Sequence, residues 1–260
     1  MILPTFKEYV NEAVVAKNLG HIRELKLGKI LRKDGLMKGA TPGFKSGHDF
    51  HLIDKREGSP KKILGKEHAT QQFHYGETKN DINHSDFGQV SLNHTPEKGW
   101  HVSPKTVKTK PLIAAAYHHM LHHHYAKDEE GNHIMKDGKK VKVIDHLNAS
   151  IPDPKEPTSK NIYSVSKDLS PMHAYLKEND VDVLHIGDRG TFRAGQSLEK
   201  DRAKLGLPIP EGEGKFRIRK KHKNGSNLMA AYRITTLKRS HINLEDDAHR
   251  AKIKKKLGHD

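Results

Sequence analysis

Residues 72–93 constrain the fold more than any other part of this sequence, because an alternating strand pattern there ends with an acidic and a basic residue. Aromatic and polar residues alternate at its start, which is typical of a half-buried β-strand. Successive side chains of a strand point to opposite faces, so Glu77 and Lys79 share one face and Thr78 points to the other. A carboxylate beside an ammonium group can hold a divalent cation and stabilise a phosphate oxyanion. A solvated Glu–Lys pair has the same pattern.

The charge balance points to a polyanionic partner. The 260 residues include 47 Lys and Arg against 32 Asp and Glu, an excess of 47 − 32 = 15 positive charges. The excess is spread along the chain rather than confined to a tail, and 21 histidines add charge at mildly acid pH. Nucleic acid, and DNA in particular, is the partner we expect. The alternative is a basic soluble protein without such a partner.

Several classes of protein are excluded or disfavoured by composition. The chain has no cysteine, which excludes disulfides, thiolate nucleophiles and thiolate metal sites. We find no apolar run long enough to span a bilayer and no apolar core of a secretory signal in residues 1–18, so we expect no membrane partner. A soluble chain is expected, located inside a cell or inside a particle assembled there.

The spacing of apolar residues predicts a mixed α/β (α+β) chain of one large or two small domains. The expected helices cover residues 6–13, 21–33, 111–126, 171–178 and 244–257. The expected strands cover residues 50–53, 63–64, 73–79, 87–92, 100–102, 161–166, 181–186, 215–221 and 228–237, with a polar linker at 103–110 and a hairpin or insertion at 128–148.

Two of these strands form a predicted basic hairpin. Asn224 and Gly225 lie between strands 215–221 and 228–237, and this dipeptide is a strong hairpin signal. One face of the first strand then carries a row of cations suited to following a phosphate backbone, although an edge strand protected by charge gives the same pattern. The row consists of Lys215, Arg217, Arg219 and Lys221.

The helix predicted at 111–126 is rich in histidine. His118 and His122 are four residues apart, as are His119 and His123, so each pair shares a helix face and could bind zinc or nickel. The helix lacks the glutamate of a His-Glu-x-x-His site, which excludes that metalloprotease motif. A histidine-based metal-binding protein is one hypothesis for the chain, and a phosphate-facing helix surface is the alternative.

A second carboxylate is needed if Glu77 is to hold a metal. Asp49 stands at the start of the neighbouring predicted strand, and two carboxylates there can hold Mg²⁺ while it keeps some of its own waters. The carbonyl of Thr78 could complete the site, and Lys79 could orient a water molecule or stabilise developing charge. Asp54 and Glu67 are competing first ligands. Glu24, on the helix at 21–33, is an additional candidate carboxylate.

These residues resemble the PD-(D/E)xK nuclease superfamily, and in particular restriction-endonuclease-like proteins of tailed phages. The resemblance is carried by Asp49, by Glu77 to Lys79 and by Gln89 in the order of the motif, with His48 in place of the proline. Similar short motifs follow, at Gly99–Trp100, at 183–192 and at 217–219. The resemblance implies a restriction-endonuclease-like central mixed sheet flanked by helices, and a nuclease that uses Mg²⁺ or Mn²⁺. Asp49 and Glu77 would be ligands, Lys79 the catalytic base or stabiliser, and Gln89 a neighbour of the site.

The first residues also resemble a known signal. A short amphipathic pattern ends at Glu12-Ala13, as in the capsid-targeting peptides of large tailed phages, which a protease cleaves after glutamate. This resemblance implies a location in the host cytoplasm or inside a virion, and an ordinary first helix is the alternative. We expect a helical segment at 1–18, a nuclease-like domain at 19–243 with an insertion at 111–160, and a basic helix at 244–260. The sequence is compatible with a homodimer.

Two other functions fit parts of the chain. A His-Asn-His metal finger would use Asp145 and His146 after a strand, with Asn161 and His173, but its spacing and the proline-rich loop at 151–160 fit poorly. A basic DNA-binding protein without catalytic activity, packaged in a phage head, explains the charge and the first residues equally well.

Overall fold

The structure is a computed structural model that describes residues 19–39, 48–56, 72–82, 86–128, 130–151, 162–166, 168–220 and 228–259. The segment that resembles a capsid-targeting peptide, the strand expected at 63–64, Glu67, Asn161 and Lys221 lie outside the described residues. The described chain is a mixed α+β structure, which confirms the expected fold class. No helix in this described part is long and apolar enough to cross a membrane.

The first sheet is mixed and has the strand order β1-β2-β8-β9. Strands β1 (Phe50–Asp54) and β2 (Gln72–Lys79) are antiparallel, and β8 (Val183–Ile186) runs parallel to β2. Strand β9 (Gly190–Arg193) is antiparallel to β8. A parallel neighbour requires a crossover connection, and here the connection contains three strands of a second sheet together with several helices.

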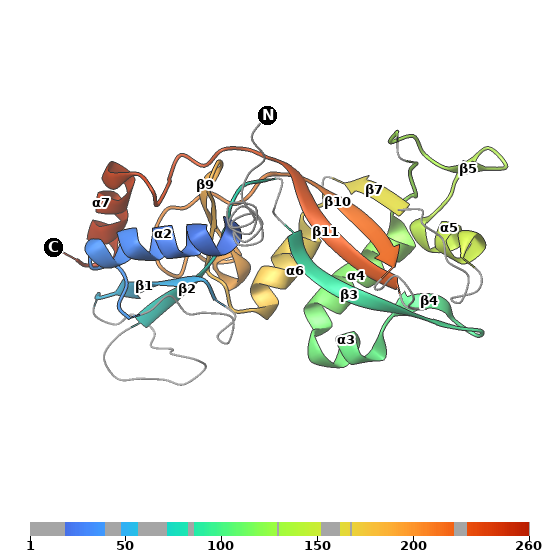
Figure 1. Cartoon of the computed structure of the whole chain (residues 1–260), viewed down its shortest axis with the longest axis horizontal. Coiled ribbons are helices and arrows are strands. Elements are labelled where there is room, and N and C mark those ends of the chain that lie inside the picture. The colour runs from blue at the N-terminus through green and yellow to red at the C-terminus, as the bar shows by residue number, and fades with distance from the viewer. Residues whose placement is uncertain are drawn as a thin grey trace, which may run out of the picture.

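Two helices from opposite ends of the chain pack beside this sheet (Figure 1). Helix α2 (Leu19–Lys33) confirms the helix expected at 21–33, and α7 (Asp247–Lys256) confirms the last one. Leu27 and Leu31 of α2 share a hydrophobic cluster with Phe50 of β1 and with Ile253 of α7. The last helix is therefore part of the core around the first sheet rather than a peripheral addition.

The second sheet is antiparallel and has the order β4-β3-β11-β10-β7, so the described residues form two larger sheets where one central sheet was expected. Its central strands are the predicted basic hairpin, whose register pairs Lys215 with Arg233 and Arg217 with Ala231. The strand bounds are β3 (Asp86–Thr95), β4 (Gly99–Val102), β7 (Ile162–Ser166), β10 (Gly212–Lys220) and β11 (Leu228–Leu237).

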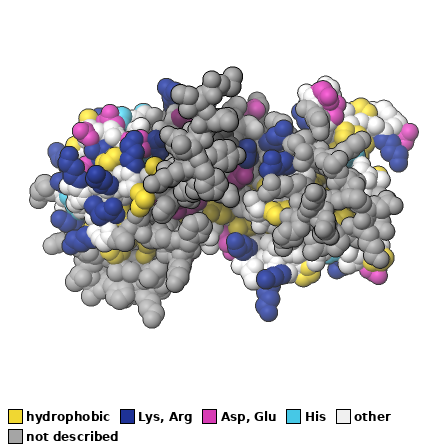
Figure 2. All heavy atoms as spheres, viewed as in Figure 1, with side chains coloured by type: hydrophobic (Ala, Val, Ile, Leu, Met, Phe, Trp, Pro, Cys, Tyr) yellow, Lys and Arg dark blue, Asp and Glu magenta, His cyan; other side chains and the backbone are white. Residues whose placement is uncertain are grey.

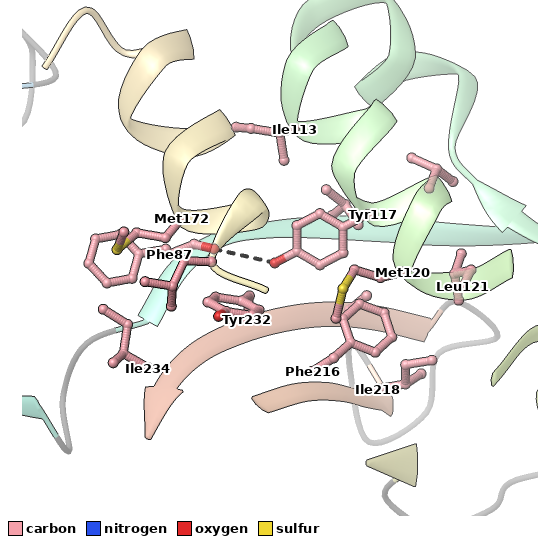
Figure 3. Close-up of a cluster of buried hydrophobic side chains, with 14 of the residues drawn as sticks. Phe87, Ile113, Tyr117, Met120, Leu121, Met172, Phe216, Ile218, Tyr232 and Ile234 are labelled. Carbon is pink, nitrogen blue, oxygen red and sulfur yellow. Dashed lines mark hydrogen bonds between the residues drawn. The ribbon is translucent and has the colours of Figure 1, made fainter. Parts of the chain in front are cut away.

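One face of the second sheet packs on α4 (Pro111–His123) and α6 (Ser170–Glu178), as Figure 3 shows. Tyr117 of α4 lies over Phe216 and Tyr232, and its hydroxyl donates to the backbone carbonyl of Gly88 at 2.9 Å. Trp100, the only tryptophan, is buried and donates from Nε1 to the carbonyl of Ile151 at 2.8 Å. Trp100 is therefore part of the core that covers the second sheet.

One expected element is wrong and another is only partly confirmed. The linker at 103–110 is a helix, α3 (Pro104–Thr109), because Ser103 caps it by accepting from the Thr106 amide and proline suits its first turn. The insertion forms a small hairpin of β5 (Met135–Lys136) and β6 (Lys139–Lys140), but it then continues into α5 (Val143–Ser150). Asp145 and His146 therefore lie on a helix, which contradicts the strand that a His-Asn-His finger requires. A short 3-10 helix covers Gly195–Leu198.

The β1–β2 pair depends on a glycine. Gly76 lies opposite Phe50, and a Cβ at Gly76 would meet the Phe50 ring at 2.1 Å. We expect Gly76→Ala to lower the free energy of unfolding by about 1–3 kcal/mol, the usual cost of overpacking a core. Denaturant titration measures this loss, and adding Phe50→Leu should restore part of it because the two sites are in contact. Purely additive losses in the double variant would contradict this steric explanation.

Candidate active site

Glu77 and Lys79 lie side by side at the end of β2. Lys79 Nζ donates to Glu77 Oε1 at 2.5 Å, which agrees with the predicted shared face. The pair is not an exposed surface pair, since Glu77 is 5% exposed and the Lys79 side chain 19%. Tyr175 of α6 adds a hydroxyl that donates to the same Glu77 oxygen at 3.3 Å. No local pattern in the sequence marks Tyr175, because it lies 98 positions after Glu77 and three strands of the second sheet come between them in the chain.

Asp49 is brought to the same strand end. It directly precedes β1, and its amide donates to the Gly76 carbonyl at 2.9 Å. Its carboxylate oxygen Oδ2 accepts from the Thr78 amide at 2.7 Å. The residue pairing of β1 with β2 thus carries a carboxylate from 28 positions earlier in the chain (77 − 49 = 28) to the backbone next to Glu77.

The Thr78 carbonyl faces the Asp49 side of β2. The carbonyls of Tyr75 and Lys79 accept backbone bonds from residues at the two ends of β8, on one side of the strand. The carbonyl of Gly76 accepts from Asp49 on the other side. Because successive carbonyls alternate in direction, that of Thr78 points as Gly76 does, toward Asp49. The oxygen predicted as a third ligand is therefore directed to the correct side.

The electrostatics show that the acidic groups act on one another. Burial and the negative charge of Glu77 raise the pKa of Asp49 to about 7, and Glu24 of α2 adds to this rise. Burial works against a charged Lys79, but Glu77 more than offsets it and the pKa of Lys79 is raised. Lys79 is consequently a fixed cation at neutral pH. Among the described residues, the carboxylates of Glu24, Asp49 and Glu77 do not form a group of three with ligand atoms within 4.8 Å of one another.

Asp54, the competing first ligand, binds Arg56 and His74 instead of facing Glu77. It is buried, accepts from the Arg56 guanidinium, and lies 2.9 Å from His74 Nε2. Although burial opposes the shift, these hydrogen bonds hold the pKa of Asp54 well below its usual range. The geometry favours Asp49 over Asp54 as the carboxylate that works with Glu77.

Aromatic rings surround the Lys79 ammonium group. Its Nζ lies 5.4 Å from the centre of the Phe87 ring and 6.0 Å from that of Tyr175, within the range of cation–π attraction. The two rings meet edge to face with centroids 5.8 Å apart. The absent Cβ of Gly88 would lie 3.3 Å from Tyr175, so glycine allows α6 to approach β3 closely here.

Gln89 is not brought into this site. The register between β3 and β11 shifts at Gly88, which has a φ of 65°, so a bulge separates Phe87 from Gln89. Phe87 and Val90 are buried while Gln89 is exposed. Among the interactions described, none joins Gln89 to Asp49, Glu77 or Lys79. The order of residues in the sequence could not reveal this, because a bulge reverses which face the following side chains occupy.

The predicted cation row lies on another side of the molecule. Lys215 and Arg217 are half-buried on β10 and alternate with Phe216, which faces the core with Phe87. They therefore occupy the face of the second sheet opposite to α4 and α6, away from the Lys79 ammonium group. Arg233 shares their face and pairs with Asp86 at 2.6 Å. The side chain of Arg219 and the whole of Lys221 lie outside the described residues.

No family model, curated protein or solved structure matches this chain.

Proposed function

We propose that the chain is a metal-dependent nuclease that hydrolyses phosphodiester bonds of DNA, with the site of the PD-(D/E)xK superfamily. The observation that carries the proposal is the meeting of Asp49, Glu77 and Lys79 at one strand end, through the Thr78 amide and the Lys79–Glu77 ion pair. Glu77 and Lys79 are held in a largely buried setting that an incidental surface pair would not need.

The residues present fit a hard divalent cation. Asp49 and Glu77 offer carboxylate oxygens, the Thr78 carbonyl faces the same side, and Glu24 adds negative charge. The repulsion that raises the pKa of Asp49 is the kind that a bound cation relieves. Oxygen ligands of this kind suit Mg²⁺ or Mn²⁺. When bound, the ion would polarise the phosphate and make a water molecule more acidic.

Lys79 acts in this proposal as a charge stabiliser and not as a base. Its pKa is raised, so it stays protonated at neutral pH and cannot accept a proton from water. Its ammonium group is fixed by Glu77 and by the rings of Phe87 and Tyr175. A preorganised cation of this kind stabilises charge that develops on a phosphate oxygen. Tyr175 positions Glu77 through its hydroxyl.

The topology of the first sheet supports the same proposal. The first sheet and its helices occur along the chain in the order α2, β1, β2, α6 and β8, with other elements between β2 and α6. Strands β1 and β2 form the antiparallel pair at the acidic residues, and β8 is parallel to β2. The central mixed sheet flanked by helices, which the resemblance implies, would correspond to this sheet. Strands β3, β4 and β7 of the second sheet would then lie in an insertion between β2 and α6, while β10 and β11 follow β9.

A basic DNA-binding protein without catalytic activity is the second candidate. Lys and Arg side chains gather over α2 and beside α7 in Figure 2. The last turn of helix α7 carries three lysines, Lys254, Lys255 and Lys256. Such a surface binds a phosphate backbone whether or not the chain cleaves it.

Plasmid cleavage distinguishes the two candidates. We expect the purified chain to nick or cut plasmid DNA with Mg²⁺ or Mn²⁺ and not with EDTA, and Glu77→Gln to reduce the rate by at least roughly 100-fold. Glu211→Gln, which changes an exposed carboxylate on another part of the chain, is the matched control and should cleave normally. Binding of DNA without cleavage by the unaltered chain would support the non-catalytic candidate.

A further inference from the structure

Three metal-binding side chains meet where α4 ends and α6 begins, away from the Glu77–Lys79 pair. His119 lies on α4, His124 directly follows this helix, and Asp168 precedes α6. One ligand atom from each lies within 4.8 Å of the other two, and His124 Nε2 is 3.8 Å from Asp168 Oδ2. We propose that His119, His124 and Asp168 bind Zn²⁺, with solvent completing the coordination.

The donor set is suited to zinc. Two imidazoles and one carboxylate are common zinc ligands, whereas Mg²⁺ and Ca²⁺ prefer oxygen alone. Ligand atoms bound to one tetrahedral zinc ion lie roughly 3.3 Å apart, so modest rotations of the exposed His119 ring and the half-buried His124 ring would close the site.

Neighbouring groups already orient these ligands. The Ser170 amide donates to Asp168 Oδ1 at 2.8 Å, and the Ser170 hydroxyl donates to Oδ2 at 2.8 Å. The Tyr232 hydroxyl donates to the Asp168 backbone carbonyl at 2.8 Å. Backbone bonds to Met120 and from Val143 fix His124 on both sides. Outer contacts of this kind set the direction of a metal ligand and raise its affinity.

The histidine pairs expected from the sequence are close but do not include the carboxylate. The rings of His118 and His122 are 4.2 Å apart, and those of His119 and His123 are 4.5 Å apart. Only His119 belongs to the three-residue group. Helical spacing could identify His119 as a ligand, but it could not identify Asp168, which comes from a distant segment.

Zinc titration of the full chain tests the proposal without any use of DNA. The chain is stripped with EDTA and titrated with Zn²⁺ against a chromophoric indicator at pH 7.5. We expect one tight site per chain, weakened at least roughly 100-fold by His119→Ala or Asp168→Asn and roughly 10-fold by Ser170→Ala. His118→Ala, on the same helix but outside the group, is the matched control and should bind as the unaltered chain does. Zinc should also raise the Tm of the unaltered chain and leave that of Asp168→Asn unchanged.

Because His119 is exposed, His119→Ala should fold normally, which circular dichroism of the metal-free variant verifies. Unchanged zinc affinity in His119→Ala and Asp168→Asn would overturn the proposal, as would an equal loss in His118→Ala. Absence of a tight site in the unaltered chain would overturn it too. None of these results depends on whether the chain cleaves DNA, so this site and the nuclease proposal can fail separately.

Discussion

Asp49→Asn is expected to abolish most cleavage and at the same time to make the chain more stable above neutral pH. The rate should fall by at least roughly 100-fold, since a neutral amide neither holds a cation as a carboxylate does nor adds to the negative field of the site. The amide oxygen of asparagine can still accept from the Thr78 amide, so the local backbone contact is kept. Cleavage falls while stability rises, because the buried Asp49 carboxylate is needed to hold the cation but destabilises the folded chain when it is charged.

The stability effect follows from the raised pKa. The pKa of Asp49 rises from an ordinary 3.8 to about 7 on folding, first through burial and then through the charge of Glu77. The folded chain therefore binds more protons than the unfolded chain between these two values, and its stability declines as the pH rises through them. Asparagine does not titrate, so the variant does not lose stability in this way. The difference in unfolding free energy between the variant and the unaltered chain should grow from about pH 4 and level off above pH 7.

Thermal unfolding of both chains from pH 4 to pH 8.5 measures this gain. We expect the Tm of the variant to exceed that of the unaltered chain by several degrees at pH 8, because about 1 kcal/mol shifts the Tm of a large domain by roughly 2–4 °C. Mg²⁺ should stabilise the unaltered chain alone. Asp201→Asn, a carboxylate outside the site, is a control for general charge effects. A variant that cleaves DNA normally would refute the assignment of Asp49, whatever its Tm.

Much of the first sheet and of the candidate site could be predicted because local patterns determine them. Alternation of side chains placed Glu77 and Lys79 on one face, and their contact agrees with this. The order of apolar residues predicted α2, β2 and the basic hairpin. Such features depend on neighbours within a few residues, which a sequence shows directly.

Features that depend on distant contacts could not be predicted. Tyr175 reaches Glu77 from a helix 98 positions later, and nothing in its own neighbourhood marks it. The bulge at Gly88 turned Gln89 away from the site, although its order in the sequence matched the motif. The polar segment at 103–110 became a helix through the Ser103 cap and through packing against α4. The contact of Tyr175 lies outside any local pattern, whereas the Ser103 cap is a local signal that the interpretation of 103–110 as a linker missed.

Lys79→Met is expected to reduce cleavage by roughly 100- to 1,000-fold and, unlike Asp49→Asn, to destabilise the chain. Lys79 is the cation that contacts the buried Glu77 carboxylate, and removal of one member of a buried ion pair costs about 3–5 kcal/mol because the other charge stays buried. Denaturant titration measures the loss. The Lys238–Glu211 pair provides a matched control, since Lys238 is 80% exposed and Lys238→Met should cost at most about 1 kcal/mol.

The double variant Glu77→Gln/Lys79→Met separates the two roles of the pair. Removal of both charges leaves no buried carboxylate without a cation, so stability should return to near that of the unaltered chain while cleavage stays lost. If stability does not recover, Lys79 contributes through its packing on Phe87 and Tyr175 rather than through the charge of Glu77. If Lys79→Met cleaves DNA at the normal rate, the ammonium group stabilises no developing charge, and its contact with Glu77 is structural alone.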